Sequence, residues 1–245
     1  MTVAEKKAYH YKWDRFQKRY ERIYTTKFKE ALQEQVEQYK KNRSINSGPI
    51  YKVLISLYKT VGPLWAQQTS LNIKRQQVKA RMPMGFNERI VELMRQYYGI
   101  DLLNDAELMT RVSRQVIADI LSDAAITGAS INEIVRSLEK HPEFNQMRAT
   151  RIARTETVTA ANGAAFIHAK ESGVAKNKIW LSINDKRTRH SHRNVDDVKL
   201  PIDTPFNVGG SLMMQPGVRK QPNGLDVPAK EVVNCRCTVA FETIE

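Results

Sequence analysis

The first forty residues carry a hydrophobic pattern that only a helix accommodates well. Between residues 4 and 43, large apolar side chains recur at spacings of three and four, which places them on one helical face, while Lys and Arg fill the other faces. These apolar positions are Trp13, Phe16, Tyr20, Ile23, Leu32, Val36 and Tyr39. A helix of about 40 residues is roughly 60 Å long. We therefore expect it to reach out and pack on a partner or a neighbouring subunit. The alternative is a hairpin with the next segment, because Gly48-Pro49 breaks the pattern and a second periodic run follows.

Helical patterns continue along the chain and are interrupted by glycine and proline. Ser130 and Glu133 have the spacing of a capping box, which predicts the start of a short helix. A later helix is expected from about Asn145, with small residues along one face that permit close packing. The predicted breaks between helices are Gly62-Pro63, Met82-Pro83, Gly99, Gly128, His141-Pro142 and Gly173.

The sequence changes character after Gly173. "KIWLSI" is typical of a strand, residues 184–230 are rich in proline, glycine and aspartate, and "VVNCRCTVAF" is the next strand signal. We therefore predict an α+β fold, with an extended, mainly helical N-terminal part followed by a small C-terminal module that contains strands. The predicted divisions are a basic extended helical region at 1–100, a second helical part at 101–173, and a β and loop module at 174–245 that ends in the CxC strand.

The positive charge is concentrated in the first hundred residues. The formal net charge is +13, and residues 1–100 hold 20 Lys and Arg against 8 Asp and Glu, whereas residues 101–245 hold 19 against 18. Such a basic field favours an acidic partner, either nucleic acid or an acidic protein surface. The alternative is a solvated helix surface whose charge serves solubility, because the basic residues are spread out.

Neither a membrane span nor a secretion signal is expected. No stretch approaches the roughly 20 apolar residues that cross a bilayer, and the start "MTVAEKKAYHYKW" lacks the apolar core of a signal peptide. We expect a protein that stays in a reducing cytosol. Its cysteines are then thiols, metal ligands or redox groups before they are a structural disulfide.

The two cysteines of the chain lie one residue apart, at Cys235 and Cys237. On a strand, residues i and i+2 face the same side, and His190 and His192 have the same spacing. Zinc favours four tetrahedral Cys and His ligands, which these two segments contain. CxC and HxH are not the usual zinc spacings, so three alternatives stay open: small buried residues of a strand, histidines bonded to backbone, or a strained local disulfide.

An enzyme is the alternative function. Asp185, His190 and His192 are residue types that activate water on a metal in hydrolases and nucleases. No zinc-protease, deaminase or Walker motif is present, so we expect no enzymatic activity and assign no catalytic residue. Arg154 and Glu156 lie two apart on a predicted helix and point to different faces, which indicates structural pairing and not an acid and base pair.

The order of these blocks is similar to the Mu F / SPP1 gp7 family of phage minor head morphogenesis proteins, over about residues 107–241. A helix with "RIARTET", a tryptophan strand, "DKRTRHSH", a "PF" loop, "PG" and "EVVNCRCT" follow one another as they do in that family. The matching residues are Arg151, Arg154, Thr155, Glu156, Asn162, Trp180, Asp185, Arg187, Thr188, Arg189, His192, Pro205, Phe206, Pro216, Gly217, Glu231, Asn234, Cys235, Arg236, Cys237 and Thr238. The last helical part and the strand module are then one family domain.

The resemblance also shows where this chain differs from the family. An Asp-Gly turn usually follows the family's histidine and an Asp follows its Pro-Gly, but here the residues are Asp196-Asp197 and Val218. Aspartate adopts a left-handed backbone less readily than glycine. The aligned histidine is His192, which leaves His190 as an optional fourth ligand.

The resemblance implies a minor capsid protein of a tailed double-stranded DNA phage or prophage. We expect it to bind the portal protein and packaged DNA during procapsid assembly, with the major capsid or scaffolding protein as a further candidate, in few copies per particle. Its expected location is the virion head, at the procapsid interior or portal vertex, after synthesis in the host cytoplasm. His192, Cys235 and Cys237 would form a structural staple, with or without zinc as the cofactor.

Overall fold

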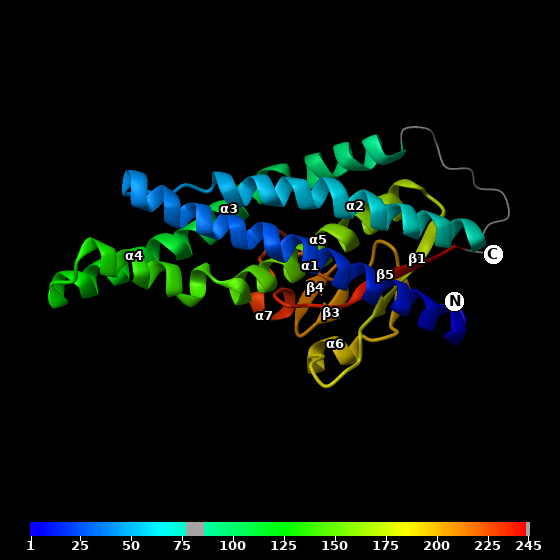
Figure 1. Cartoon of the computed structure of the whole chain (residues 1–245). Coiled ribbons are helices and arrows are strands. Elements are labelled where there is room, and N and C mark those ends of the chain that lie inside the picture. The colour runs from blue at the N-terminus through cyan, green and yellow to red at the C-terminus, as the bar shows by residue number, and fades with distance from the viewer. Residues whose placement is uncertain (77–85, 244–245) are drawn as a thin grey trace. The chain divides into compact units, whose positions relative to one another are not determined.

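The computed structural model describes residues 1–76 and 86–243, and the break predicted at Met82-Pro83 lies outside them. Long helices come first and short strands follow, which confirms the α+β prediction (Figure 1). The elements in chain order are α1 (Val3–Asn42), α2 (Gly48–Gln76), α3 (Phe86–Thr127), α4 (Ile131–Lys140), the 3₁₀ helix η1 (Pro142–Phe144), α5 (Gln146–Glu171), β1 (Ala175–Leu181), α6 (His190–Asn194), β2 (Lys199–Pro201), β3 (Phe206–Val208), β4 (Ser211–Met213), α7 (Ala229–Val232) and β5 (Thr238–Thr243). No described helix has both the length and the apolar character that crossing a membrane requires.

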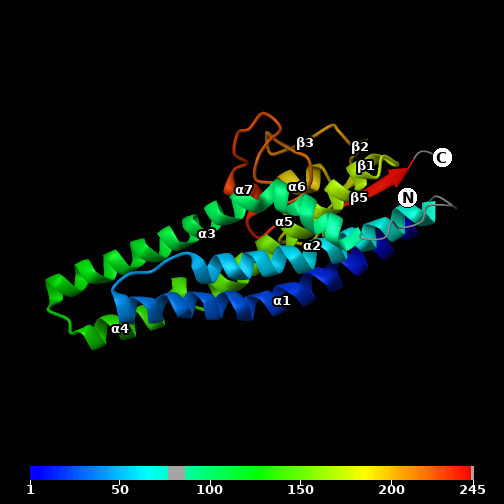
Figure 2. The same ribbon diagram turned by 90° about the horizontal axis from the view of Figure 1, so that it is seen from above.

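This chain itself covers most of the predicted apolar face of α1, although Ile23 on that face is exposed. Trp13, Phe28 and Leu32 are fully buried, and the Tyr24 hydroxyl donates to the carbonyl of Ser56 on α2 at 2.9 Å. The two helices run side by side in both views (Figures 1 and 2). The hairpin alternative therefore holds, and the expectation that this apolar face packs on a partner is wrong, because α2 and the C-terminal module already bury most of it.

Two predicted breaks lie inside continuous helices. α2 passes through Gly62-Pro63, and α3 passes through Gly99. A Cβ at Gly62 would lie 2.2 Å from the Met94 sulfur and 3.2 Å from the Ala164 Cβ, so this glycine lies where helices approach closely. Gly99 has open space around it. Within a helix a glycine costs about 1 kcal/mol and a proline such as Pro63 about 3 kcal/mol, and the buried residues on both sides of these positions outweigh these costs.

The other predicted helix ends are confirmed. Ser130 and Glu133 form both hydrogen bonds of a capping box at the start of α4. His141-Pro142 ends that helix, and the Asn145 side chain accepts from the backbone N–H of Met147 at 2.8 Å at the start of α5. Cap and breaker residues act locally, which is why the sequence predicted these ends correctly.

The chain forms two compact units. One comprises Met1–Tyr20, Leu57–Tyr97 and Arg154–Glu245, and the other comprises Glu21–Ser56 and Tyr98–Ala153. Within the second unit, the buried guanidinium of Arg148 donates to the Ser113 hydroxyl at 3.0 Å and the Met109 carbonyl at 2.6 Å. This arginine joins the start of α5 to α3.

The first unit contains every described strand. β1 lies between β2 and β5 in an antiparallel sheet, and β3 pairs with β4. α5 contributes buried small residues to this unit, among them Ala160, Ala161, Ala164 and Ala165, all fully buried. Small side chains allow backbones to approach closely. The predicted small-residue face of α5 is therefore an interior face, and it supports the C-terminal module.

A lysine is buried at the centre of this sheet. Lys178 on β1 is fully buried, and its Nζ donates to the Met214 carbonyl at 2.9 Å. The same nitrogen lies 5.0 Å from the ring centre of Phe166 and 5.1 Å from that of Phe206. Burial lowers the pKa of Lys178 to about 7, although Asp203 acts to raise it. The folded protein therefore holds this amine partly neutral near neutral pH.

The lowered pKa of Lys178 predicts how the free energy of unfolding depends on pH. The pKa of about 7 in the folded state is below the ordinary value of 10.5, so between these pH values the unfolded chain binds more protons. The free energy of unfolding should then rise with pH across this window, by up to about 1.4 kcal/mol per pH unit from this group. Urea unfolding of Lys178→Met should lack this rise, whereas Lys176→Met, at an exposed position of the same strand, should keep it. An equal pH dependence in both variants would contradict the assignment.

Candidate functional site

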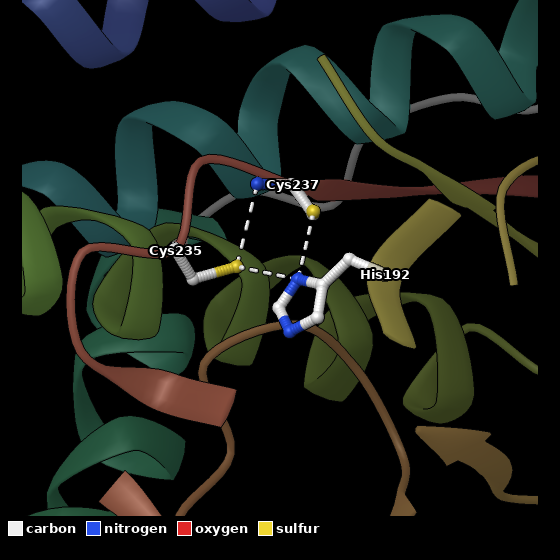
Figure 3. Close-up of side chains that lie close together, drawn as sticks. All are labelled: His192, Cys235 and Cys237. Atoms are coloured by element: carbon white, nitrogen blue, oxygen red, sulfur yellow. Dashed lines mark hydrogen bonds between the residues drawn. The ribbon is translucent and has the colours of Figure 1, made fainter. Parts of the chain in front are cut away.

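His192, Cys235 and Cys237 lie together in the interior of the first unit. The Nδ1 atom of His192 is 3.3 Å from the Cys237 sulfur and 3.7 Å from the Cys235 sulfur. The three candidate ligand atoms lie within 4.8 Å of one another, and all three residues are buried. Figure 3 shows both sulfurs and the imidazole pointing toward one another. The structure therefore joins three of the four predicted metal ligands.

Local structure places both thiols on the same side. The segment after α7 turns at Asn234, whose φ is +59°, and the Cys235 N–H donates to the Val232 carbonyl at 3.1 Å. The backbone N–H of Cys237 points back to the Cys235 sulfur at 3.4 Å. The CxC pair thus precedes β5 instead of lying within it. Its spacing still brings both side chains to one imidazole, as expected for an extended segment.

Glu231 completes this group on the far side of the imidazole. Its Oε2 atom lies 3.1 Å from His192 Nε2 and accepts a hydrogen bond from the Ser191 hydroxyl at 2.7 Å. Glu231 is only 4% exposed. The Trp180 ring meets the imidazole edge-on, with 5.6 Å between ring centres. The imidazole is therefore held on one side by a carboxylate and against one face by an indole.

The two thiols differ in their tendency to ionise. Hydrogen bonds from Cys237 and His192 lower the pKa of Cys235 well below its usual value. Burial beside that thiolate raises the pKa of Cys237. For His192, burial opposes the charged form, but its contact with Cys235 outweighs burial and raises the pKa. The contacts within the group accordingly favour ionisation of Cys235 over ionisation of Cys237, and they favour the charged form of His192.

Asn162 on α5 anchors the chain as it leaves the CxC pair. This fully buried amide donates from Nδ2 to the Cys237 carbonyl at 3.0 Å. Its Oδ1 accepts from the Thr238 hydroxyl at 2.9 Å and from the Val239 N–H at 3.2 Å. One side chain thus satisfies three polar groups at the start of β5. The predicted family asparagine serves as the link between α5 and the CxC strand.

Asn234, Arg154 and Thr155 form a second link between these segments. The Arg154 guanidinium donates to the Asn234 side-chain oxygen at 3.2 Å, and the Asn234 N–H donates to the Thr155 hydroxyl at 3.0 Å. From α1, the Trp13 indole donates to the Arg236 carbonyl at 2.8 Å, and the Tyr9 hydroxyl donates to the Val239 carbonyl at 2.9 Å. The CxC segment is therefore held between α5 and the first half of α1.

The loop before α6 is tied to the CxC segment by two arginines. Arg236 forms a bidentate pair with Asp185, at 2.7 and 2.6 Å. The hydrogen bonds from Arg236 are the main reason why the pKa of Asp185 lies well below its usual range. Arg189 donates to the carbonyl of Val233. Arg187 is exposed, and its backbone N–H donates to Asp185 Oδ1 at 2.9 Å. These contacts hold the loop on the segment that carries the cysteines.

His190 does not join the group, so the structure does not support it as a fourth ligand. Its side chain is exposed, and its Nε2 lies 3.2 Å from the Asn194 amide nitrogen. The prediction treated HxH as a strand spacing, but both histidines belong to the short helix α6. Residues two apart on a helix point about 200° apart, so only His192 faces the interior.

The same geometry bears on the hydrolase or nuclease alternative. Asp185 is paired with Arg236, His190 is on the surface, and His192 faces two thiols. Over residues 1–76 and 86–243, the His, Cys and acidic side chains that converge as candidate ligands are those of His192, Cys235 and Cys237. The three residues named for hydrolysis therefore do not form one water-activating site.

Two further family residues, Glu156 and Gly217, form close contacts around the same core. Glu156 accepts a hydrogen bond from the Tyr58 hydroxyl at 3.1 Å and pairs with Arg219. Gly217 adopts a φ of +86° against Thr159, whose hydroxyl donates to the Gly217 carbonyl at 3.1 Å. The "PG" block of the sequence is thus a place where a loop approaches the backbone of α5.

Asp196-Asp197 stands where the family usually has an Asp-Gly turn, and the turn is still formed. Asp197 adopts a left-handed backbone with a φ of +62°, and its N–H donates to the Trp180 carbonyl at 2.8 Å. The Asp196 side chain accepts from the Ser182 N–H at 2.8 Å. Short polar side chains tolerate this backbone region better than other non-glycine residues. The loop after His192 therefore closes back on β1 despite the missing glycine.

Sequence reasoning missed several participants. Ser191 and the interior role of Lys178 were not predicted, and Glu231 was named without its contact to the imidazole. Lys178 in "KNKIWL" could have been noticed in the sequence. Charged residues rarely occupy a buried strand, so a lysine within such an apolar run indicates a special environment. The Ser191 and Glu231 contacts left no such signal, because they join residues about forty positions apart.

Comparison with known proteins agrees with the blocks that form this core. Residues 115–240 match the family described as Phage Mu protein F like protein. The NAD(+)--arginine ADP-ribosyltransferase EFV of Enterococcus faecalis is 33% identical over 135 residues, which are 54% of this chain and 25% of that protein. Uncharacterized protein YqbB of Bacillus subtilis is 28% identical over 137 residues, 55% of this chain and 44% of YqbB.

A third relative is the Minor head protein GP7 of Bacillus phage SPP1, 26% identical over 147 residues, 58% of this chain and 46% of that protein. The chain thus spans a quarter to just under half of the length of these relatives. No solved structure gives a significant match. The family match covers more than half of the chain and includes the residues that surround the CxC pair. The chain therefore belongs to the Phage Mu protein F like family.

Proposed function

We propose that this protein is a minor head protein that acts in phage head morphogenesis, binds the portal protein and contacts packaged DNA. The observation that carries the proposal is the match to the Minor head protein GP7 of Bacillus phage SPP1, within the family to which the chain belongs. The relative named as an ADP-ribosyltransferase matches over only 25% of its length. We therefore assign no such activity to this chain and propose a structural role in the virion head.

The interior of the C-terminal module supports a structural role. The family residues on α5, in the loop before α6 and around the CxC pair bond mainly to one another and to backbone. The cavity next to His192 and the two cysteines measures about 20 Å³, room for about one water molecule. Such a core stabilises a docking module.

The outer face of α1 supports contact with a polyanion. In the first unit this helix exposes Lys7, Lys12, Arg15, Lys18 and Arg19. Tyr11 is 64% exposed, and the Arg15 guanidinium lies over its ring at 5.6 Å. Because Trp13 and Tyr9 point inward, the basic side chains remain on the outer face. Lysine and arginine neutralise phosphates along DNA without reading its sequence. We assign the DNA contact to this face.

Expression with the neighbouring head genes tests the proposal. Wild-type protein should co-purify with the portal protein and be incorporated into procapsids in few copies. The triple variant Lys12→Gln, Arg15→Gln, Arg19→Gln should still bind the portal protein. Its affinity for duplex DNA should depend less on salt, with the slope of log K against log salt smaller by about 3.

The control removes the same charge elsewhere, at the exposed Arg111, Arg136 and Lys140 of the second unit. It should bind DNA as the wild type does. Wild-type protein that is absent from particles and does not bind the portal protein would overturn the proposed function. Loss of portal binding in the α1 triple variant alone would instead assign the basic face to an acidic protein surface.

A further inference from the structure

The contacts around His192 bring three potential metal ligands to one point. One ring nitrogen, Nδ1, faces two sulfurs, at 3.3 and 3.7 Å. A single cation between the three atoms would bind all of them. In a tetrahedral zinc site, the usual Zn–S and Zn–N bond lengths separate sulfur and nitrogen ligands by about 3.5 Å. The two observed distances lie on either side of that value.

The opposite side of the imidazole has the partner that metal-binding histidines use. A histidine ligand usually donates its second ring N–H to a carboxylate, which fixes the tautomer. Here Glu231 Oε2 lies 3.1 Å from His192 Nε2. Glu231 is itself held by Ser191, and a Cβ at Gly209 would lie 2.7 Å from its Oε1, so the carboxylate has little freedom to move. With Nε2 donating to Glu231, the Nδ1 lone pair is directed at the sulfurs.

We propose that His192 Nδ1, Cys235 Sγ and Cys237 Sγ bind one zinc ion, and that Glu231 is a positioning residue that orients His192. Two thiolates, one neutral imidazole and Zn²⁺ give a neutral centre, which suits a buried position. The cavity of about 20 Å³ that adjoins all three ligands has room for a water molecule as the fourth ligand. The donor set is the soft sulfur and imidazole type that zinc favours in proteins.

A cysteine nucleophile is the other chemistry that this arrangement suggests. A thiol, an imidazole and a carboxylate in a row also form a catalytic triad. Such a nucleophile must reach a substrate, but Cys235 is 1% exposed and Cys237 is 3% exposed. Both thiols also face the same nitrogen, whereas a nucleophile needs only one. Burial and the paired thiols therefore favour a structural metal ion.

The ion would close a long loop. His192 lies 43 residues before Cys235 and 45 before Cys237, and β2, β3 and β4 lie between them. A zinc ion would join the short helix α6 to the start of β5. Because ions that bind only the folded chain stabilise it, the module should become more stable when zinc is present.

The experiment begins with the wild-type chain, purified without a histidine tag in buffers free of chelator. Elemental analysis should find about one zinc per chain. After replacement of zinc by Co²⁺, the spectrum should show thiolate-to-cobalt charge transfer and the visible bands of tetrahedral cobalt. Cys235→Ser, Cys237→Ser and His192→Asn should each reduce the bound zinc at least tenfold. His190→Asn, two residues away on the same helix and exposed, is the matched control and should keep full zinc content.

The variant Glu231→Gln tests whether Glu231 orients His192 or only helps the chain to fold. This variant should still bind one zinc in excess metal, with a Kd raised about 10- to 100-fold. Chelation should lower the Tm of the wild type by roughly 10 °C, and the double variant Cys235→Ser, Cys237→Ser should show no response to zinc or chelator. Wild-type protein that stays metal-free in added zinc, or zinc content that the cysteine variants leave unchanged, would overturn the proposal.

Discussion

Replacing Asn162 with leucine should lower the free energy of unfolding by about 3–5 kcal/mol. The amide is fully buried and serves the Cys237 carbonyl, the Thr238 hydroxyl and the Val239 N–H. Leucine fills a similar volume but leaves all three groups without this partner. Each buried polar group that loses its hydrogen bond costs about 1–3 kcal/mol. The loss should be visible as an earlier midpoint in urea unfolding.

Thr157 offers a matched control on the same helix. It is fully buried like Asn162, but among the described residues its hydroxyl has no hydrogen-bond partner. Thr157→Val removes this hydroxyl and keeps the shape, so it should leave the stability unchanged or raise it by up to about 1 kcal/mol. Similar losses in Asn162→Leu and Thr157→Val would mean that the three bonds of Asn162 are not what holds β5 to α5.

Gly217→Ala should be the second large effect, a loss of about 3 kcal/mol. Gly217 has a φ of +86°, which costs an L-residue about 1–2 kcal/mol. A Cβ there would also lie 2.9 Å from the Thr159 Cα and 3.1 Å from its backbone nitrogen. A helix backbone cannot give way as a flexible side chain does, so overpacking adds about 1–3 kcal/mol. Thermal unfolding should show the variant melting well below the wild type.

Gly224 is a control that distinguishes the cost of a positive φ from the cost of overpacking. Its φ is +85°, almost the same as that of Gly217, but nothing lies within 4 Å of the position where a Cβ would be. Gly224→Ala should therefore lose only the conformational part, about 1–2 kcal/mol. If both alanine variants lost the same stability, the close approach of the Gly217 loop to α5 would contribute nothing, contrary to the geometry.

These predictions concern one continuous core. Asn162 and Asn234 are family residues that join the CxC segment to α5, and Gly217 lies where a loop packs on the same helix. Asp185 and Arg236 hold the loop before α6 on the CxC segment. The residues shared with the family thus serve mostly to fix a module of short strands. β2, β3 and β4 each have only three residues, so these side-chain bonds add to a small number of sheet hydrogen bonds.

Local patterns were predicted best. The long first helix, the capping box at Ser130 and the strand at Trp180 follow from periodicity and cap chemistry within a few residues. The breaks predicted at Gly62-Pro63 and Gly99 were wrong. A glycine has the same local signature whether it ends a helix or makes room for a neighbouring one, and only the neighbour decides between these roles.

In the candidate site, too, some features were predicted from the sequence and others were decided only by the tertiary structure. The sequence by itself predicted that Cys235 and Cys237 lie near His192, through the spacing of CxC and the order of the family blocks, and the structure brings the three side chains together. Tertiary structure decided that His190 faces solvent, because HxH has opposite meanings on a strand and on a helix. It also placed Glu231 behind the imidazole and Asn162 under the Cys237 carbonyl. These contacts join residues 39 and 75 positions apart, and such contacts depend on how α5, α6 and β5 pack, which no local pattern records.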